Sequence, residues 1–320
     1  MAARRDEIPP WVDVALIPLL NLTVALLIAG LVVVVIGESP LDALAILLNG
    51  SLGSLKGWGY LLYYATNFTF TGLAVAVAFH AGLFNIGGEG QVYIAGLGAG
   101  IVGLNLGFLP VVVSVPLAIL ASMLFGAAWA FIPAYLQARR GSHIVITTIM
   151  FNFIAASLMV YLINNLFRPT GRMAVESRGI DDVWMPSFRE IGLWLGVKLP
   201  NTPLNVTVFL AAAAAVAVWY LLWRTRLGYE IRAVGASPDA AVYGGIKPDR
   251  IIIIAMLISG GLAGLMAVNE ILGVQHRLVL EFAGGAGFVG IAVALMGRSH
   301  PVGVVLSAML FGLLYQGGAE

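Results

Sequence analysis

Charged residues divide the chain into long apolar stretches. Eight stretches without Asp, Glu, Lys or Arg are long enough for a helix, and they cover 14–37, 57–88, 90–138, 141–167, 199–223, 251–269, 282–297 and 299–319. A charge at the middle of a membrane costs roughly 2.5 kcal/mol or more, so these stretches are predicted to be membrane-spanning helices. The stretch 90–138 is too long for one helix and is broken between Asn105 and Pro110, which predicts two helices there and about nine to ten crossings in total.

The segment between the first two stretches adds a shorter element. In 38–56, leucine and alanine recur near helical spacing over less than a membrane thickness, which predicts a short helix at the membrane interface. Backbone groups in lipid must be hydrogen-bonded within the protein, and helices satisfy them locally. The chain is therefore predicted to be an all-α integral membrane protein.

Composition excludes several classes of function. Of 320 residues, 60% are hydrophobic, and only 17 are basic and 16 acidic; mean hydropathy is +0.96. Soluble domains use about a quarter of their residues for charge, so a soluble enzyme, a nucleic-acid-binding protein and a disordered scaffold are excluded. The net charge of +1 gives no attraction to polyanions, and the lack of cysteine excludes disulfides and thiolate metal sites. We expect membrane lipid around the chain, no nucleic-acid partner and no metal site.

The positions of the basic residues predict the orientation of the chain in the membrane. Residues 1–13 contain two arginines and are followed by no small-residue cleavage site, which is typical of a cytoplasmic N-terminus ahead of a single membrane domain over 14–320. Counting crossings from there places the arginine-bearing segments 133–143 and 224–250 on the cytoplasmic side, in agreement with the positive-inside rule. The loop 167–203 then lies on the extracytoplasmic side, where its five basic and four acidic residues nearly balance.

Two short stretches of the sequence are alike. Residues 88–95 and 285–292 match at five of eight positions, and a weaker likeness continues downstream. Small-residue membrane sequences also match by chance, so duplication and coincidence both stay open. In a duplicated chain, a first repeat of about 58–166 and a second of about 251–320 would form an inverted repeat, the usual build of transporters whose pathway lies between the halves.

Each of these stretches begins at a glycine cluster. Glycine weakens a helix by roughly 1 kcal/mol and permits positive φ, so the clusters are predicted to break helices as hinges or to line a cavity, with close helix packing as the alternative. The hinge candidates are Gly87, Gly88, Gly90, Gly284, Gly285 and Gly287. For Gly260 and Gly264, inside an apolar stretch, close packing is expected. Glu89 could bind substrate, accept backbone hydrogen bonds from a broken helix or face the cytoplasmic vestibule, and we favour the structural role. Glu270, at the end of an apolar stretch, is expected at the membrane interface.

The segment 224–250 carries the clearest local signals. Ser237 followed by Pro238 predicts a helix start, Asp239 suits the positive end of that helix, and Gly244-Gly245 predicts its end. A helix of about seven residues is unstable alone, so it is expected to pack on something else. An ordinary solvated loop is the alternative.

Three motifs carry a resemblance to a known family. They are His80-Ala-Gly-Leu-Phe-Asn-Ile-Gly-Gly-Glu-Gly-Gln91, the loop Gly228-Tyr-Glu-Ile-Arg-Ala-Val-Gly235 with Ala240-Ala241 and Gly244-Gly245-Ile246, and the ending Tyr315-Gln-Gly-Gly-Ala-Glu320. From about residue 14 onward the chain resembles the permease subunit of bacterial ABC importers, in the nucleoside and simple-sugar branch related to ribose and branched-chain amino-acid permeases. Similar permeases usually continue past Glu320 into a last helix, so the resemblance leaves open a shortened chain or an absent final crossing.

The resemblance implies a type II importer fold with two inverted five-helix halves, in the bacterial cytoplasmic membrane. The partners it implies are a second permease chain, ABC ATPase subunits that bind ATP and Mg, and an extracytoplasmic substrate-binding protein, while this chain binds no cofactor itself. Residues 237–245 would be the coupling helix that sits in a groove of the ATPase. The coupling residues are then Glu230, Arg232, Ala233, Gly235, Pro238, Asp239, Ala240, Ala241 and Gly244.

Two classes of function remain. The chain has no Gly-x-x-x-x-Gly-Lys-Ser/Thr loop, so the importer hypothesis predicts a non-catalytic subunit that translocates nucleosides or simple sugars. The alternative is an ion-coupled secondary transporter of a small polar solute, with Glu89, Glu270, His80 and His276 as ionisable candidates. Candidates for the substrate pathway offer amide groups, a carboxylate and aromatic faces; they are Phe84, Asn85, Glu89, Gln91, Tyr93 and Asn152. For each, helix packing or a gate is the alternative.

Overall fold

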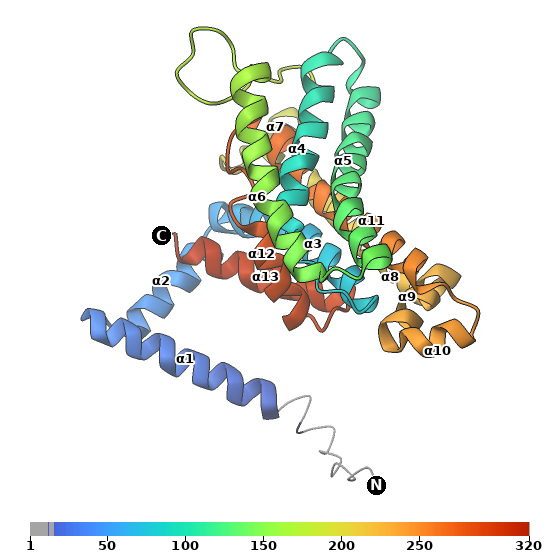
Figure 1. The fold of residues 1–320 in the computed structure, drawn as a ribbon. Helices are drawn as coiled ribbons and strands as arrows, with labels where there is room; N and C mark the ends of the chain where they lie inside the picture. Colours follow the sequence, from blue (N-terminus) through green and yellow to red (C-terminus); the bar gives the residue numbers. More distant parts are fainter. Residues whose placement is uncertain (1–11, 13–15, 320) are drawn as a thin grey trace.

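The computed structural model describes residue 12 and residues 16–319, and this part of the chain is helical, with no β-strand beyond two isolated bridges (Figure 1). The α-helices are α1 (Ile17–Ile36), α2 (Pro40–Leu52), α3 (Leu55–His80), α4 (Gly88–Asn105), α5 (Val111–Arg140), α6 (Ile144–Leu162), α7 (Phe188–Trp194), α8 (Thr207–Arg224), α9 (Arg226–Ala236), α10 (Pro238–Tyr243), α11 (Pro248–Glu270), α12 (Ala286–Met296) and α13 (Pro301–Gly317). Two π-helical turns, η2 (Ile163–Phe167) and η3 (Ile271–Gln275), extend α6 and α11. The prediction of an all-α chain is confirmed for these residues.

Several of these helices fit a membrane. In the described part, α3, α5, α6 with η2, α8, and α11 with η3 are long and apolar enough to span one, and the count rises to six if α1 and α2, bent by 110°, form one broken span. The predicted break in 90–138 is confirmed, since α4 ends at Asn105 and α5 begins at Val111. The predicted short helix in 38–56 is confirmed as α2, and its place at a membrane interface stays a prediction.

The apolar stretch 282–297 differs from the expectation. Its helix α12 has 11 residues, which is about 16 Å of helix, whereas the apolar core of a membrane is about 30 Å thick. The helix starts late because Gly284 and Gly285 adopt positive φ angles of 55° and 80°, which do not continue a helix. This stretch cannot cross as a single helix, and the total of nine to ten crossings stays a prediction.

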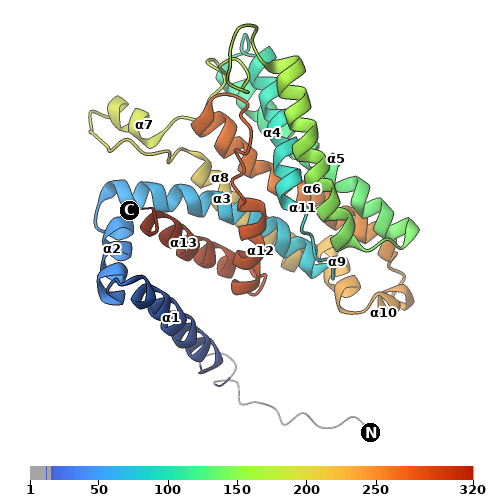
Figure 2. The ribbon, with the colours of Figure 1, turned by 60° about the vertical axis from the view of Figure 1, so that its left-hand side comes forward.

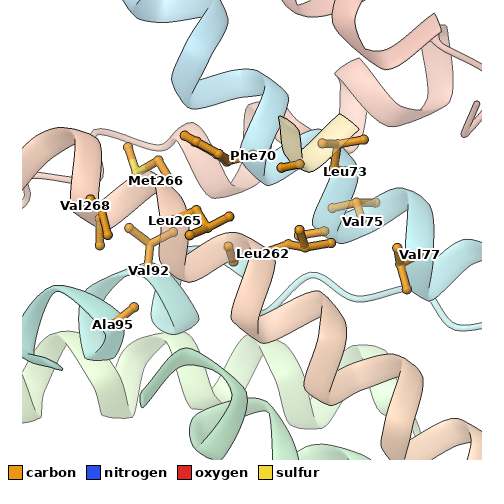
Figure 3. Packing of buried hydrophobic residues seen from close by; sticks show 14 of the residues in the cluster. Phe70, Leu73, Val75, Val77, Val92, Ala95, Leu262, Leu265, Met266 and Val268 are labelled. Atoms are coloured by element: carbon orange, nitrogen blue, oxygen red, sulfur yellow. The ribbon is translucent and has the colours of Figure 1, made fainter. Parts of the chain in front are cut away.

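The helices α3 and α11 form the centre of the bundle. In the most apolar 18-residue part of each helix, 83% of α3 and 72% of α11 with η3 is buried. The corresponding shares are 22% for α5 and 28% for α6 with η2. Phe70 and Leu73 of α3 face Leu265 and Met266 of α11, and α4 adds Val92 to the same cluster (Figure 3). The outer helices leave apolar faces exposed, as expected of surfaces that meet lipid or another chain.

Small residues bring α4, α5 and α11 close together. A Cβ at Gly260 would lie 2.6 Å from the Cβ of Ala130, and one at Gly264 would lie 2.6 Å from the carbonyl oxygen of Ser122. The hydroxyl of Ser122 donates to Ala95 O at 3.1 Å and to Gly264 O at 2.8 Å. The expectation that Gly260 and Gly264 serve close packing is confirmed.

The segment that carries α7 and the segment that carries α9 and α10 lie at opposite ends of the bundle (Figures 1 and 2). At one end, a Cβ at Gly59 near the start of α3 would lie 2.6 Å from Thr202, in the loop that carries α7. At the other end, Gly235 of α9 packs against the end of α3 at His80. The helix α7 was not predicted, although its capping box is visible in the sequence: Ser187 accepts from Glu190 N, and Glu190 accepts from Ser187 N.

Candidate functional site

The predicted short helix in 224–250 is confirmed as α10. Ser237 Oγ accepts a hydrogen bond from Ala240 N at 3.3 Å, and Gly245 turns the chain away with φ 77°. The sequence reasoning missed α9, which immediately precedes it. Its signals were present: Thr225 Oγ1 caps the helix by accepting from Gly228 N at 3.0 Å.

A groove of about 350 Å³ separates α9 from α10. Of the predicted coupling residues, those that line it are Glu230, Ala233, Ala240, Ala241 and Gly244. Beside the groove, the side chains of Val242 and Tyr243 are 57% and 96% exposed. A groove of small residues next to exposed apolar side chains at the end of a membrane bundle is suited to docking another protein. Pro238 and Asp239 are exposed beside the groove without lining it.

Gly235 and Arg232 lie on the other side of α9. A Cβ at Gly235 would collide with the carbonyl oxygen of His80 and lie 2.9 Å from Gly82 N, so only glycine permits this contact. Arg232 is half-buried beside His80. The helix pair α9–α10 is therefore attached directly to the end of α3 and to the loop 81–87 that follows it.

His80 extends this contact to the turn between α12 and α13. Its Nε2 lies 3.1 Å from Ser299 O, and its ring packs edge-on against Trp223 at 5.3 Å between centroids. Ser299 adopts a positive φ of 53° in this turn. A movement of α9 would reach the end of α3, the loop 81–87 and the start of α13 through direct contacts.

Three of the predicted pathway residues form a buried amide cluster around the loop 81–87. Asn85 Nδ2 donates to Gln91 Oε1 at 3.1 Å and to Ser259 Oγ at 2.9 Å, and Asn85 Oδ1 accepts from Gly87 N at 2.9 Å. Asn152 Oδ1 accepts from Gly90 N at 2.8 Å, and Asn152 Nδ2 donates to Ile86 O at 2.9 Å. These groups are engaged with protein partners, so the geometry favours a structural role for them.

Two aromatic pathway candidates pack on neighbouring rings. Phe84 meets Phe79 edge-on at 5.2 Å and lines a small cavity of about 320 Å³ next to Gln137 and Ser142. Tyr93 meets Phe282 edge-on at 5.5 Å. Contact of either residue with a solute stays a prediction.

Glu89 joins the two glycine clusters. Its Oε1 accepts from Gly285 N at 2.9 Å, and its Oε2 accepts from Gly287 N at 2.9 Å. A Cβ at Gly287 would lie 2.6 Å from Glu89 Cα, so the starts of α4 and α12 are in backbone contact. The expectation that Glu89 accepts backbone hydrogen bonds is confirmed, and a hinge at the glycine clusters stays a prediction. The similar stretches 88–95 and 285–292 thus begin at the same place.

From this meeting point α4 and α12 lead to opposite ends of the bundle. The end of α4 meets the loop that carries α7, where Arg178 donates to Leu104 O. The turn after α12 meets the end of α3, where Ser299 O contacts His80. Helix N-termini carry partial positive charge, so one carboxylate near two of them is electrostatically favourable.

Glu270 is not exposed, which differs from what is expected of a residue at the membrane interface. Its side chain is buried, accepts a hydrogen bond from the Tyr63 hydroxyl, and accepts another from Asn67 Nδ2 at 2.7 Å. Asn67 Oδ1 accepts in turn from Asn269 Nδ2 at 2.7 Å, and Asn269 Oδ1 accepts from Asn205 Nδ2 at 2.8 Å. This network, which we call the Glu270 network, connects α3, α11 and the segment before α8. The sequence could not reveal it because the partners are about 200 residues apart.

A larger cavity of about 570 Å³ opens beside the Glu270 network. It lies between the start of α3, the loop around α7 and the end of η3. Its lining includes three tyrosines, an arginine, a histidine and polar side chains: Tyr60, Tyr63, Tyr64, Ser187, Arg189, Glu190, Asn201, Thr202 and His276. Burial lowers the pKa of His276, against the opposing effect of Glu190 and Asp181. Sequence reasoning missed this cavity because three separate segments contribute to it.

Comparisons with known proteins identify the family. The chain is 36% identical to the guanosine ABC transporter permease protein NupP of Bacillus subtilis over 93% of this chain and 83% of the relative. It is 33% identical to the nucleoside ABC transporter permease protein NupB of Lactococcus lactis over 94% and 83%, and 33% identical to the glucose ABC transporter permease protein TsgB13 of Haloferax volcanii over 99% and 83%. No solved structure matches this chain. Residues 58–320 match the family model described as the permease component of branched-chain amino acid transport systems, and the chain therefore belongs to that family of membrane permeases.

Proposed function

We propose that this chain is the membrane-spanning permease subunit of an ABC importer that carries nucleosides or simple sugars across the bacterial cytoplasmic membrane. Relatives named for guanosine, nucleoside and glucose transport support it, at 33–36% identity over nearly the whole chain. In this account the chain is non-catalytic, and separate ATPase subunits bind ATP and Mg.

The helix pair α9–α10 is the observation that carries the proposal. It presents a groove and the exposed Tyr243 at one end of the bundle, and it is attached through Gly235 to the end of α3. An ATPase subunit that docks there would push on α3 and on the loop 81–87 directly, because α9 contacts both without a flexible linker. This is the arrangement that a mechanically driven subunit requires.

The junction where α4 and α12 begin is the part of the bundle that such a push would move. The loop 81–87 leads directly into α4, and the turn after α12 contacts His80, so both helices are connected to the docking end. Because they start at the same point and lead to opposite ends, they support two halves of inverted topology. A helix as short as α12, with 11 residues, is tolerated inside a membrane where protein or a watery pathway surrounds its ends.

The orientation of the bundle suggests where the substrate-binding protein and a second permease chain would bind. In this account the N-terminus and the α9–α10 end face the cytoplasm, and the loop 168–206 faces outward, where a substrate-binding protein would deliver solute. A second permease chain would cover exposed apolar faces of the outer helices. The many exposed apolar side chains of α1, such as Val35 at 78%, are compatible with lipid or that second chain.

Uptake by cells tests the proposal and separates it from an ion-coupled transporter. Cells that express this chain with its ATPase and substrate-binding partners are given labelled guanosine, adenosine, glucose or ribose, under ATP depletion or with an uncoupler. The proposal predicts uptake that ATP depletion abolishes and the uncoupler spares. Uptake that disappears with the proton gradient while ATP is maintained would contradict it.

A further inference from the structure

We propose that the cavity of about 570 Å³ at the α7 end of α3 is a receiving site for the transported solute, and that it selects neutral solutes that combine a ring face with several hydroxyl groups. Nucleosides and hexoses share this chemistry. The inference rests on the proposed function and deepens it, because neither the family match nor any relative assigns a binding site to these residues. The cavity also contains none of the pathway residues that the sequence predicted.

The first support is the arrangement of three tyrosines. Tyr60, Tyr63 and Tyr64 are spaced i, i+3 and i+4 along α3, so they share one face of that helix, and all three line the cavity. The rings of Tyr63 and Tyr64 lie 5.0 Å apart at 55°. Tyrosine provides a flat apolar face for stacking and a hydroxyl for hydrogen bonding, which suits a base or a sugar ring.

The second support is the polar content of the walls. Asn201, Thr202 and His276 provide both hydrogen-bond donors and acceptors, which a polyhydroxylated solute needs. The charged lining is one arginine, Arg189, and one carboxylate, Glu190, whose Oε2 already accepts from Ser187 N at 2.8 Å. The opposite charges balance, so the lining offers no net attraction to an anionic or cationic solute. The volume lies within the usual range of about 300–1,000 Å³ for small-molecule sites.

The third support is the buried network behind the tyrosines. The Tyr63 hydroxyl donates to Glu270, which is 3% exposed and is also bonded to Asn67. Burying a carboxylate costs free energy unless hydrogen bonds compensate, and here they fix the ring of Tyr63 at the edge of the cavity. Glu270 and Asn67 are positioning residues in this account, since only Tyr63 reaches the cavity itself.

The fourth support is the backbone conformation at the end of α11. The π-helical turn η3 is followed by His276 with φ 48°, a left-handed conformation that side chains other than glycine adopt infrequently. π-helical turns and such backbone outliers concentrate at functional sites, where they aim particular side chains. Gly273 lets η3 approach the network closely, because a Cβ there would lie 2.7 Å from Asn205 Cγ.

The location fits reception of a solute. The cavity is bordered by the loop 187–203 and lies at the end of α3 opposite Gly235 and the helix pair α9–α10. A solute released on the α7 side would therefore meet the tyrosines before it meets the junction of α4 and α12. Tyr63 and the Glu270 network connect the cavity to both central helices, α3 and α11.

The test measures concentration dependence of uptake by the complete transporter. Proteoliposomes that contain this chain with its ATPase and substrate-binding partners are given guanosine, adenosine, glucose or ribose, and the half-saturating concentration is measured for wild type, Tyr60→Ala, Tyr64→Ala and Tyr63→Phe. Binding of the same four labelled solutes to the purified permease in nanodiscs is measured in parallel. Tyr220→Ala on α8 is the control, because its side chain is 58% exposed and does not line the cavity.

We expect Tyr60→Ala and Tyr64→Ala to raise the half-saturating concentration and the dissociation constant at least tenfold for the best of the four solutes. Tyr63→Phe retains the ring and should show a smaller rise, which separates positioning from stacking and guards against misfolded alanine variants. Glu270→Gln should raise the half-saturating concentration more than it lowers the maximal rate. Thermal unfolding of each variant checks folding.

The outcomes separate this inference from the function on which it rests. ATP-driven uptake by wild type together with unchanged half-saturation and binding in all tyrosine variants would overturn the receiving site and leave the importer intact. Absence of ATP-driven uptake of all four solutes by wild type would overturn the proposed function, and the receiving site with it. A solute preference for guanosine and adenosine, or for glucose and ribose, identifies which members of the shared class the site takes.

Discussion

Glu89 Oε2 accepts a hydrogen bond from Gly287 N at 2.9 Å, so the second residue of α4 caps the start of α12, which lies almost 200 residues further along the chain. The other carboxylate oxygen accepts from Gly285 N. A single side chain thus holds the two similar stretches of the sequence together. The junction is stabilised by charge as well as by hydrogen bonds, because both helix N-termini carry partial positive charge.

Replacing Glu89 by glutamine should weaken this junction. The amide retains one acceptor oxygen, but its NH2 group then faces a backbone N–H that has lost its partner. Such a buried unpaired group costs about 1–3 kcal/mol, so we expect a lower unfolding temperature and slower uptake. Glu38→Gln, in the exposed turn between α1 and α2, is the control and should match wild type. A Glu89→Gln protein as stable and active as wild type would contradict the capping role.

Gly287→Ala tests the close approach of α4 and α12. Its Cβ would collide with backbone atoms of Glu89, which cannot move aside as a side-chain tip can. We expect loss of folded protein or of transport. The control Gly261→Ala also places a methyl group in a buried helix, but the nearest atom is 3.5 Å away, so it should be tolerated. Yield from size-exclusion chromatography and uptake rates measure both; equal behaviour of the two variants would refute the contact.

Gly235→Ala should separate the helix pair α9–α10 from the end of α3. The added methyl group would collide with His80 O and crowd Gly82 N. We expect the membrane bundle to fold, with ATP hydrolysis that no longer drives uptake at the wild-type ratio. The ratio of ATP hydrolysed to solute taken up is the measurement. A wild-type ratio would show that force reaches the bundle by another route.

Asn67→Ala should destabilise the centre of the bundle. It removes one of the two donors to Glu270 Oε1 and the acceptor of Asn269 Nδ2, which stays buried without it, so we expect a loss of about 1–3 kcal/mol. Asn164→Ala is the control, because Asn164 is exposed and its partners, Val160 O and the Arg168 side chain, each lie four residues away at the surface. Denaturation of both variants in the same detergent measures the difference, and equal stability would argue against the network.

The half-buried position of His276 predicts that the stability of the folded protein depends on pH. Burial places its pKa in the folded protein below the ordinary value of 6.5, so the unfolded chain binds more protons as the pH falls. The contribution of His276 to stability is therefore complete above about pH 6.5 and is lost as the pH falls toward its lower folded value. We expect wild type to lose more stability than His276→Gln between pH 7.5 and pH 5.5. Parallel curves for the two proteins would disprove the shift.

The sequence was informative where structure is local. Charges that interrupt apolar stretches located the long helices, and the start signals at Ser237 and Pro238 located α10, because capping acts over three or four residues. The break before Val111 followed from the segment Asn105 to Pro110, which begins with a polar residue and ends with proline.

Other features depend on contacts that no local pattern contains. The burial of Glu270 depends on Tyr63 and Asn67, which another helix supplies, and without them the same residue at the end of an apolar stretch predicts an exposed position. The short length of α12 follows from the positive φ of Gly284 and Gly285, which the sequence shows only as two glycines. The pathway residues were predicted from side chains that could bind a polar solute. The same amide groups can bond to the protein itself, as they do in the cluster around Asn85.

The central claim is that ATP bound elsewhere drives solute through this chain by way of α9–α10. The most direct test measures accumulation of labelled guanosine or glucose in proteoliposomes without an ion gradient, with and without ATP and Mg, for wild type and for a variant in which Pro238-Asp239-Ala240 is replaced by Gly-Ser-Gly. The account predicts ATP-dependent accumulation by wild type and none by the variant, with the same thermal stability of the membrane bundle. Undiminished accumulation by the variant, or accumulation driven by an imposed proton or sodium gradient without ATP, would contradict it.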